Sequence, residues 1–494
     1  MSDNNQSSYR SIFKATSLFG GVQVYQILIQ IIKSKFVAVL LGPAGVGIMG
    51  LYQSGLQLVQ QLSSMGLANS AVRDVSEANG SNDIHRIAKT ITIVRKLVWI
   101  TGLFGLIIVV CCSPFLSKVS FGNYDYTIPF IILSVTLLID QLSAGQRVIL
   151  QGMRKLKELA KCSAFGSTFG LFVSVPLYYL LGIEGIVPTL ILSSVCSLTL
   201  SWYYSRKIKI EKIQVTPKQT FEQGRQMLVM GISMSLSAIF VTIVSFAIRG
   251  FIQNRGGIEQ VGLFQAGFVI MNSYVGLITN AIATDYYPRL AAVNKDDQKC
   301  REVVCHQGEI ASLILAPMLT ICLVFMPFVV KLLYSDSFSA ANDYISWACL
   351  GMMLRLGAWL IAHLFIAKAE SKLYIWVELS VNIYNLVFCI IGYHFFGLLG
   401  LGIAFALEYF VYFIQVYIIA RKRYGFNFSN SFVKCYGIQL LLVVLCLFVV
   451  LAFDGLAKYA MGTAIILISI YLGVKGLNQR MNLVGFIKGK ISKK

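Results

Sequence analysis

Amide and ammonium side chains lie inside apolar segments of this sequence, where they are costly. One helical face near the N-terminus carries four of them, at spacings of three or four residues: Gln23, Gln26, Gln30 and Lys33. Lys35 lies about 200° around the same helix, so we expect it to pack, pair or snorkel instead of sharing that face. A charge at the centre of a membrane helix costs roughly 2.5–3.5 kcal/mol, and an entering anion offsets that cost. We therefore expect Lys33 to face a cavity.

Other apolar segments carry similar polar faces. They comprise Gln53, Gln57, Gln60 and Ser64; Asp140, Ser143 and Arg147; Thr242, Ser245 and Arg249; Glu378, Asn382 and Asn385; and Arg355 with Trp359 and His363. Lipid does not tolerate such faces, so they predict either a water-lined cavity or helices cross-linked by hydrogen bonds. Arg249 lies near a helix end and also fits snorkelling, whereas Asp140 and Arg147 also fit a structural pair. His363 is more typical of a hydrogen-bonded packing residue than of a proton relay.

These residue types suit an anionic substrate that is rich in hydroxyl groups. Guanidinium and ammonium groups bind phosphate oxygens, and amides hydrogen-bond sugar hydroxyls. The candidate substrate-binding residues are Lys33, Arg249, Arg355, Arg147, Gln30, Gln53 and Gln57. The candidate ion-coupling residues are Asp140, Glu378 and Glu408. Salt bridges to Arg147 or Arg355 explain the first two carboxylates equally well.

No residue pattern indicates catalysis, a metal or a cofactor. Cys300, Cys305 and His306 lie together in a charged segment but lack the paired spacing of a zinc site. Most of the 11 cysteines fall in apolar runs, where a thiol behaves as a small hydrophobe, so we expect no disulfide framework. The sequence has neither a glycine-rich phosphate loop nor an acidic pair at metal spacing. We expect a protein that is not an enzyme.

The composition is that of a polytopic membrane protein. Hydrophobic residues make up 56% of the 494 residues, charged residues only 13%, and the mean hydropathy is +0.71. The polar segment MSDNNQSSYR at the N-terminus lacks the pattern of a cleavable signal peptide. We therefore expect an N-terminus that stays in the cytosol.

Apolar runs of about 20 residues predict fourteen membrane helices. Their ranges are 14–41, 44–68, 91–112, 127–149, 161–181, 185–204, 226–252, 261–284, 307–333, 342–367, 374–394, 398–420, 433–453 and 459–476. With the N-terminus inside, most of the 42 lysines and arginines fall in cytoplasmic segments, as the positive-inside rule requires. Both termini are then cytoplasmic. The net charge of +20 reflects this topology and attraction to anionic lipids, and it does not indicate nucleic-acid binding.

An internal repeat divides the chain into two halves. Four pairs of segments recur in order at nearly one offset: GLYQSG (50–55) and GLFQAG (262–267), LGIEGI (181–186) and FGLLGL (396–401), RK (206–207) and RK (421–422), and KL (155–156) and KL (372–373). Each half holds an even number of helices and enters the membrane from the same side. The halves are therefore expected to be related by an axis along the membrane normal, as in transporters that rock about a central site.

The predicted fold is all-α, with about fourteen transmembrane helices in two pseudo-symmetric six-helix lobes around a central cavity. The expected parts are a cytoplasmic N-terminus (1–13), a first lobe (14–204), a cytoplasmic linker (205–225), a second lobe (226–420), two extra helices (433–476) and a basic cytoplasmic tail (477–494). In this arrangement the polar faces line the cavity between the lobes.

Four segments carry a resemblance to a known family: LGPAGVGIMGLYQS (41–54), its echo at 261–267, YYPRLA (286–291) and ARKRYG (420–425). They are similar to the bacterial polysaccharide-export flippases of the Wzx or O-antigen type. The superfamily also holds the multidrug and toxin extruders and the lipid II flippase MurJ. The resemblance implies alternating access that moves an undecaprenyl-pyrophosphate-linked oligosaccharide, such as an O-antigen repeat unit of lipopolysaccharide, from the cytoplasmic to the periplasmic leaflet of the inner membrane.

The resemblance also implies roles and partners. Lys33 corresponds to the cationic first-helix site that such flippases use toward pyrophosphate, and Arg249 to a cation in the opening helix of the second half. The implied partners are the lipid-linked oligosaccharide, membrane lipids, and a polysaccharide polymerase with its chain-length regulator. No cofactor is implied.

Differences from related families narrow the class of substrate that we expect. MurJ carries an arginine in its second helix, where this chain has glutamines, which disfavours lipid II. Many multidrug extruders carry carboxylates deep in the first helix, and this chain has none there. Two alternatives stay open: a cation-coupled exporter of the same fold that uses the candidate carboxylates, and a membrane-embedded glycosyltransferase or polysaccharide polymerase. Polymerases usually expose a sizeable external loop, whereas the longest one expected here, Ser113 to Tyr126, has 14 residues.

Overall fold

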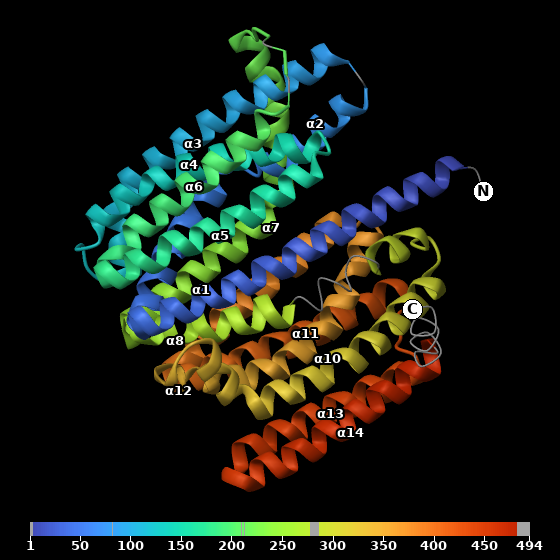
Figure 1. Cartoon of the computed structure of the whole chain (residues 1–494). Helices are drawn as coiled ribbons and strands as arrows, with labels where there is room; N and C mark the ends of the chain where they lie inside the picture. The colour runs from blue at the N-terminus through green and yellow to red at the C-terminus, as the bar shows by residue number, and fades with distance from the viewer. Residues whose placement is uncertain (1–2, 82, 209, 212, 277–285, 482–494) are drawn as a thin grey trace. The chain divides into compact units, whose positions relative to one another are not determined.

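The computed structural model describes residues 3–81, 83–208, 210–211, 213–276 and 286–481 (Figure 1). Within these ranges all regular elements are helical. They are α1 (Asp3–Ser64), α2 (Leu67–Gly80), α3 (Ile84–Phe121), α4 (Thr127–Gly152), α5 (Leu156–Leu181), η1 (Gly182–Gly185), α6 (Ile186–Ser205), α7 (Pro217–Gly256), α8 (Ile258–Val269), η2 (Ile270–Val275), α10 (Asp297–Leu333), η3 (Asp336–Phe338), α11 (Ala341–Ala367), α12 (Ser371–Tyr424), α13 (Asn430–Ala452) and α14 (Gly455–Met481). The chain forms two compact units, unit 1 (Met1–Gly262) and unit 2 (Leu263–Lys494).

Ten helical spans of the described chain are long and apolar enough to cross a membrane. Three of them, Gly21–Ser64, Leu156–Ser205 and Ser371–Tyr424, have 44, 50 and 54 residues, against the roughly 20 that one crossing needs. Each contains a break, at Gly42, at η1 and at Gly397, and so provides two of the predicted helices. The predicted helix 261–284 overlaps α8 and η2 and extends into residues that the structure does not describe. The prediction of about fourteen helices is consistent with this count.

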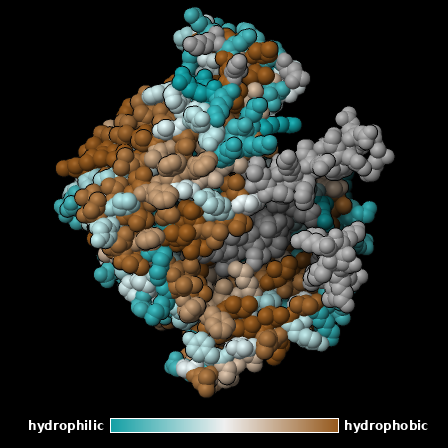
Figure 2. All heavy atoms as spheres, in the orientation of Figure 1, coloured by the Kyte–Doolittle hydropathy of each residue, from teal (hydrophilic) through white to brown (hydrophobic). Residues whose placement is uncertain are grey.

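Unit 1 is built around a core that α2, α3, α4 and α7 share. α2 is a 14-residue amphipathic helix, too short to cross a membrane, whose apolar face contributes Leu67, Ala71 and Val75. α3 packs on α4, and α4 packs on α6. Figure 2 shows hydrophobic residues over the sides of the helices in this unit and hydrophilic residues near α2. Such apolar sides suit contact with lipid chains.

Unit 2 is built around α11, which packs against α12, a helix whose two arms meet at the break at Gly397. α10 contacts α11 as well as the two last helices, α13 and α14. In unit 1, α7 packs on α1, α2 and α3, although the sequence repeat begins its second copy with this helix. The boundary between the compact units differs from the boundary between the two copies of the repeat. The lobe boundaries therefore stay a prediction.

The second pair of repeated segments has the same backbone geometry in both copies. Gly182 has φ 56° and ψ −132°, and Gly397 has φ 57° and ψ −136°, a left-handed region that favours glycine. The second glycine of each segment approaches the preceding helix. A Cβ on Gly400 would overlap the Gly392 carbonyl oxygen, and a Cβ on Gly185 would lie 2.6 Å from the Leu177 carbonyl oxygen. Both segments are therefore tight reversals between antiparallel helices.

A second pair of turns repeats with non-glycine residues. Arg154 (φ 54°), after α4, corresponds to Ala369 (φ 59°), after α11. In both turns the next residue donates a backbone hydrogen bond across the turn, from Lys155 N to Leu150 O at 2.8 Å and from Glu370 N to Phe365 O at 3.0 Å. Arg154 and Ala369 are separated by the same number of residues as Gly182 and Gly397. The sequence match of Lys155 with Lys372 is therefore two residues out of register, and Lys155 corresponds to Glu370.

Candidate functional site

The charged residues of unit 2 come together between α11 and the two arms of α12. The reversal at Gly397 places the start of α12 beside its second arm, where Ser380 and Gln415 hydrogen-bond to each other at 2.9–3.0 Å. We call the charged cluster here the Arg355 network. Its members are Arg355, Glu378, Glu408, Asn272, Asn385, Tyr409 and Tyr412. Three helical elements, α11, α12 and η2, supply them.

Arg355 is tethered to an amide and an aromatic ring. Its Nη1 donates to Oδ1 of Asn272 at 2.8 Å, and its guanidinium carbon lies 5.5 Å from the centre of the Tyr409 ring, within reach of a cation–π contact. Asn272 lies in η2, a short π-helix, and such π-bulges occur frequently at functional sites. The sequence pattern placed Arg355 in mid-helix but gave no sign of Asn272.

Both carboxylates of the network have hydrogen-bond donors. Glu408 is 3% exposed and accepts a bond from Nδ2 of Asn385 on the other arm of α12. Glu378 accepts a bond from the Tyr412 hydroxyl at 3.4 Å. The Arg355 guanidinium attracts both carboxylates electrostatically. A buried charge is tolerated in a helix bundle only when it is neutralised in this way.

This geometry joins residues that the sequence analysis had placed in two groups. Arg355 was expected to bind substrate, and Glu378 and Glu408 to couple ions. Arg355 lies within electrostatic reach of both carboxylates, and its role as substrate ligand or as partner of Glu378 stays a prediction. The surroundings of His363 fit the expectation of a hydrogen-bonded packing residue. Its Nδ1 lies 2.9 Å from the Trp359 carbonyl oxygen, and its ring lies 4.1 Å from the Trp359 ring.

In unit 1, the polar face of α4 packs against α6. The Ser143 hydroxyl lies 3.0 Å from that of Ser197 and 3.2 Å from that of Ser201. On the same face Asp140 lies near Ser194 and within electrostatic reach of Arg147. The roles of Asp140 and Arg147, as a structural pair or as functional residues, stay predictions.

The polar side chains in the first arm of α1 differ in their contacts and in their exposure. Nε2 of Gln26 donates to the Ser163 carbonyl oxygen of α5 at 3.3 Å, as expected for a glutamine that cross-links helices. Gln30 is exposed and Lys33 is half-buried. In the second arm of α1, Gln53 is half-buried and Gln57 is exposed. Lys33, Gln30, Gln53 and Gln57 remain predicted binding residues.

Arg249 does not snorkel. Its side chain is 6% exposed, and Nη1 donates to the carbonyl oxygen of Ser245 at 3.0 Å and to the Ser245 hydroxyl. One turn further on, Nε2 of Gln253 donates to the Phe121 carbonyl oxygen at 3.3 Å, which ties α7 to the end of α3. The guanidinium is therefore held inside the protein, as expected for a residue of functional or structural importance.

The cysteines and the histidine of the charged segment form no metal-binding group. Cys300 donates to the Val293 carbonyl oxygen at 3.3 Å, and Cys305 accepts from the Ser429 backbone amide at 3.3 Å. In the described part of the chain, no three His, Cys, Asp or Glu side chains come together in a way that could hold a metal ion.

Comparison with known proteins identifies the family. Residues 36–343, more than half of the chain, match the family described as polysaccharide biosynthesis protein. The chain belongs to this family. A protein named lipid III flippase from Escherichia coli (strain K12) is 24% identical over 433 residues, which cover 84% of this chain and 100% of that relative. A protein of the same name from Shigella flexneri matches to the same extent.

Solved structures share the fold. An inward-facing MATE family multidrug resistance transporter of the MOP superfamily matches with a TM-score of 0.69 at 17% identity, covering 81% of this chain and 94% of that chain. The lipid II flippase MurJ, in an inward closed conformation, matches with a TM-score of 0.62 at 12% identity, covering 95% and 99%. These likenesses confirm the predicted polytopic all-α fold.

Proposed function

We propose that this chain is a flippase that moves an undecaprenyl-pyrophosphate-linked oligosaccharide, an O-antigen or related repeat unit, from the cytoplasmic to the periplasmic leaflet by alternating access. The observation that carries the proposal is the match over the whole length of a lipid III flippase, in a chain of the polysaccharide biosynthesis family. That relative is named as a flippase of lipid III. The chain is thus a transporter in a membrane and not an enzyme.

The proposed substrate site uses the cations and amides of α1 and α7. Lys33 is half-buried within an apolar stretch, where an ammonium group gains most from an anionic partner. Its long flexible side chain suits a pyrophosphate that arrives and leaves, whereas Arg249 is held by Ser245 and offers a fixed fork of donors. Gln30, Gln53 and Gln57 supply amides for sugar hydroxyls. Arg147, which lies within electrostatic reach of Asp140, completes the proposed set.

The Arg355 network is proposed to couple transport to an ion. When a proton or another cation neutralises Glu378 or Glu408, the attraction of that carboxylate for Arg355 is lost. The freed guanidinium can then change partners, which is the kind of local electrostatic event that biases a two-state transporter. Asp140, which lies within electrostatic reach of Arg147, is the third proposed ion-coupling residue.

A cation-coupled exporter of small molecules is the second candidate. It is favoured by the fold match to a MATE family transporter, together with the buried carboxylates of unit 2. Export of a cationic dye by the purified protein, without movement of lipid-linked oligosaccharide, would establish it in place of the flippase.

The proposed location is the bacterial inner membrane with both termini cytoplasmic, on the basis of the distribution of lysine and arginine. In that setting a polysaccharide polymerase and a chain-length regulator are the proposed partners, because they act on the lipid-linked units that the flippase delivers.

A deletion strain tests the proposal in cells. Without the flippase, undecaprenyl-pyrophosphate oligosaccharide should accumulate in the inner membrane and polysaccharide at the surface should fall, and the wild-type chain should restore both. Extracted lipids analysed by mass spectrometry measure the accumulation. The proposal is wrong if the strain loses only resistance to cationic dyes while its lipid-linked intermediates stay at wild-type levels.

A further inference from the structure

One face of α11 carries a strip of three side chains, two of which have no role in the proposed function. Between residues 351 and 365 of this helix, Arg355, Trp359 and His363 keep part of their surface exposed, and every other residue is buried. The three are spaced four residues apart, so they lie on one face of the helix. The Arg355 network includes the first of them, whereas Trp359 and His363 lie outside it.

The strip does not have the composition of a surface that faces lipid. Arginine and histidine are costly in the hydrocarbon core of a membrane, and those that occur there face the interior of a helix bundle or a cavity that holds water. Side chains that pack against other helices are buried, as the rest of this stretch is. A partly exposed strip that contains both an arginine and a histidine therefore borders a space that water and a polar ligand can enter.

Three aromatic rings meet at this strip, those of Tyr287, Trp359 and His363, and we call them the aromatic platform. The centres of the Trp359 and His363 rings lie 4.1 Å apart, and the Tyr287 ring, whose residue is 40% exposed, meets His363 edge to face at 6.5 Å. Tyr286 is fully buried, and its hydroxyl donates to the Leu360 carbonyl oxygen at 2.6 Å. This bond fastens the segment that carries Tyr287 to α11, so the platform is formed before a ligand arrives.

The aromatic platform also presents polar groups that the protein does not use. Nδ1 of His363 lies 2.9 Å from the Trp359 carbonyl oxygen, which can only accept, so Nδ1 carries the proton of the neutral ring and Nε2 is an acceptor. Of the residues that the structure describes, none forms a hydrogen bond with Nε2 of His363, with the indole N–H of Trp359 or with the Tyr287 hydroxyl. The platform thus offers an acceptor, a donor and a hydroxyl group beside its ring faces.

We propose that the aromatic platform binds a sugar ring of the lipid-linked oligosaccharide, an inference that rests on the function proposed above. One face of a pyranose consists of C–H groups with partial positive charge, which stack on the negative face of an aromatic ring. The sugar hydroxyls around that face donate to Nε2 of His363 and accept from the Trp359 indole. An acyl chain would cover the same rings but leave these polar groups without partners, which is costly.

The test compares the binding of two lipids to the purified full-length chain by native mass spectrometry. The first is the undecaprenyl-pyrophosphate oligosaccharide extracted from the deletion strain, and the second is undecaprenyl pyrophosphate without sugars. The wild type should bind the first more tightly. Trp359→Leu and Tyr287→Leu should each weaken binding of the first about fivefold, the contribution of one aromatic contact, and should change binding of the second less than about twofold. Trp359→Phe, which keeps a ring face, should lose less than Trp359→Leu.

A matched control changes a tryptophan elsewhere in unit 2. Trp376 is 72% exposed on α12 and belongs neither to the aromatic platform nor to the Arg355 network, so Trp376→Leu should keep the wild-type affinity for both lipids. Tyr287→Leu keeps the proposal testable if Trp359→Leu does not fold, because Tyr287 lies at the surface of its unit.

The outcomes separate this proposal from the proposed function. A wild type that binds the two lipids equally, or platform variants that weaken binding of both lipids equally, would overturn the sugar site and leave the flippase in place. A wild type that binds neither lipid would overturn the proposed function together with the site. Platform variants that lose binding of an aromatic dye but keep binding of the glycosylated lipid would overturn the sugar site in favour of an aromatic ligand.

Discussion

At the scale of single residues, helical periodicity located the polar side chains but not their partners. Spacing alone places Glu378 and Asn385 on one face, and it predicts that Arg355 lies deep in the membrane. That Arg355 lies within electrostatic reach of Glu408 depends on a hairpin between them, and Asn272 reaches Arg355 from a π-helix. Neither contact has a signal in local sequence, because both join segments far apart in the chain.

A double-mutant cycle tests the Arg355 network. Arg355→Met leaves Glu408 without its positive neighbour, and Glu408→Gln leaves the guanidinium without that carboxylate. Each single change should destabilise the protein by about 1–3 kcal/mol, the range for leaving a buried polar group unsatisfied. The double variant should lose less than the sum of the two, because each removes the unpaired charge that the other leaves.

The apparent unfolding temperature in detergent measures this cycle, with the exposed Arg421→Met as a control that should change little. Additive losses in the double variant would show that Arg355 and Glu408 act independently, contrary to the network described here.

At the scale of elements, apolar runs predicted the membrane helices well and the short elements poorly. A pattern of apolar runs of about 20 residues does not predict α2, because its 14 residues are apolar on one face only. Two glycines in the repeated segments, Gly182 and Gly397, have the same structural role. Gly182 and Gly397 begin equivalent reversals with the same left-handed backbone, which explains why the two segments match in sequence.

The close approach at the α12 reversal gives a prediction about packing. Gly400→Ala should lower the apparent unfolding temperature, because its Cβ would overlap the Gly392 carbonyl oxygen and force the two arms apart. Gly437→Ala is the matched control in α13, where nothing lies within 4 Å of the added methyl group. It should be neutral or stabilise by up to about 1 kcal/mol through helix propensity. Equal effects of the two substitutions would contradict the close packing of the reversal.

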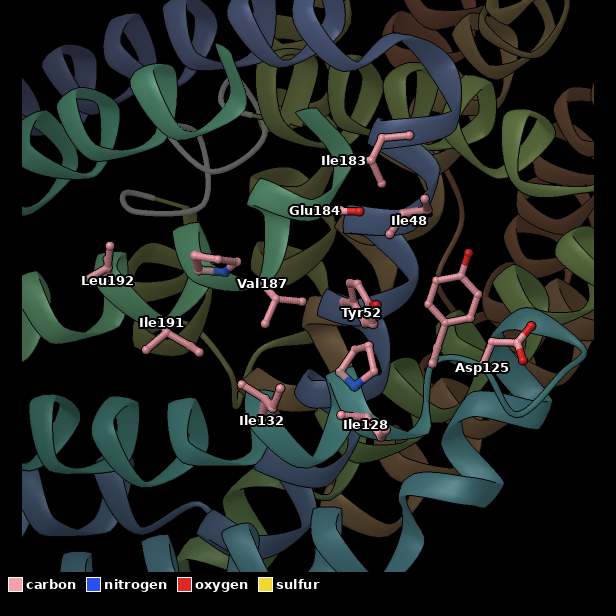
Figure 3. Close-up of a pocket in the computed structure, with 13 residues that line it drawn as sticks. Ile48, Tyr52, Asp125, Ile128, Ile132, Ile183, Glu184, Val187, Ile191 and Leu192 are labelled. Carbon is pink, nitrogen blue, oxygen red and sulfur yellow. The ribbon is translucent and has the colours of Figure 1, made fainter. Parts of the chain in front are cut away.

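At the scale of the whole molecule, composition predicted a polytopic helical membrane protein, which the fold confirms. The resemblance of four segments predicted a polysaccharide-export family, which the family match confirms. The substrate is harder to predict, because flippases and drug exporters share this architecture and differ in a few side chains. Sequence patterns also give no sign of a pocket in unit 1 (Figure 3), because its walls come from three segments, 48–52, 125–132 and 183–192, that meet only after folding. Cations at positions such as Lys33 and Arg249 therefore carry the substrate prediction.

The most direct test measures translocation of a labelled undecaprenyl-pyrophosphate oligosaccharide in proteoliposomes. We expect the wild type to move the label, Lys33→Ala and Arg249→Ala to reduce the rate at least about tenfold at matched folding and expression, and Lys35→Ala, on another face of α1, to stay near the wild-type rate. A wild type that moves no labelled lipid but expels a cationic dye, or a Lys33→Ala variant with an unchanged rate, would contradict the flippase with a cationic substrate site.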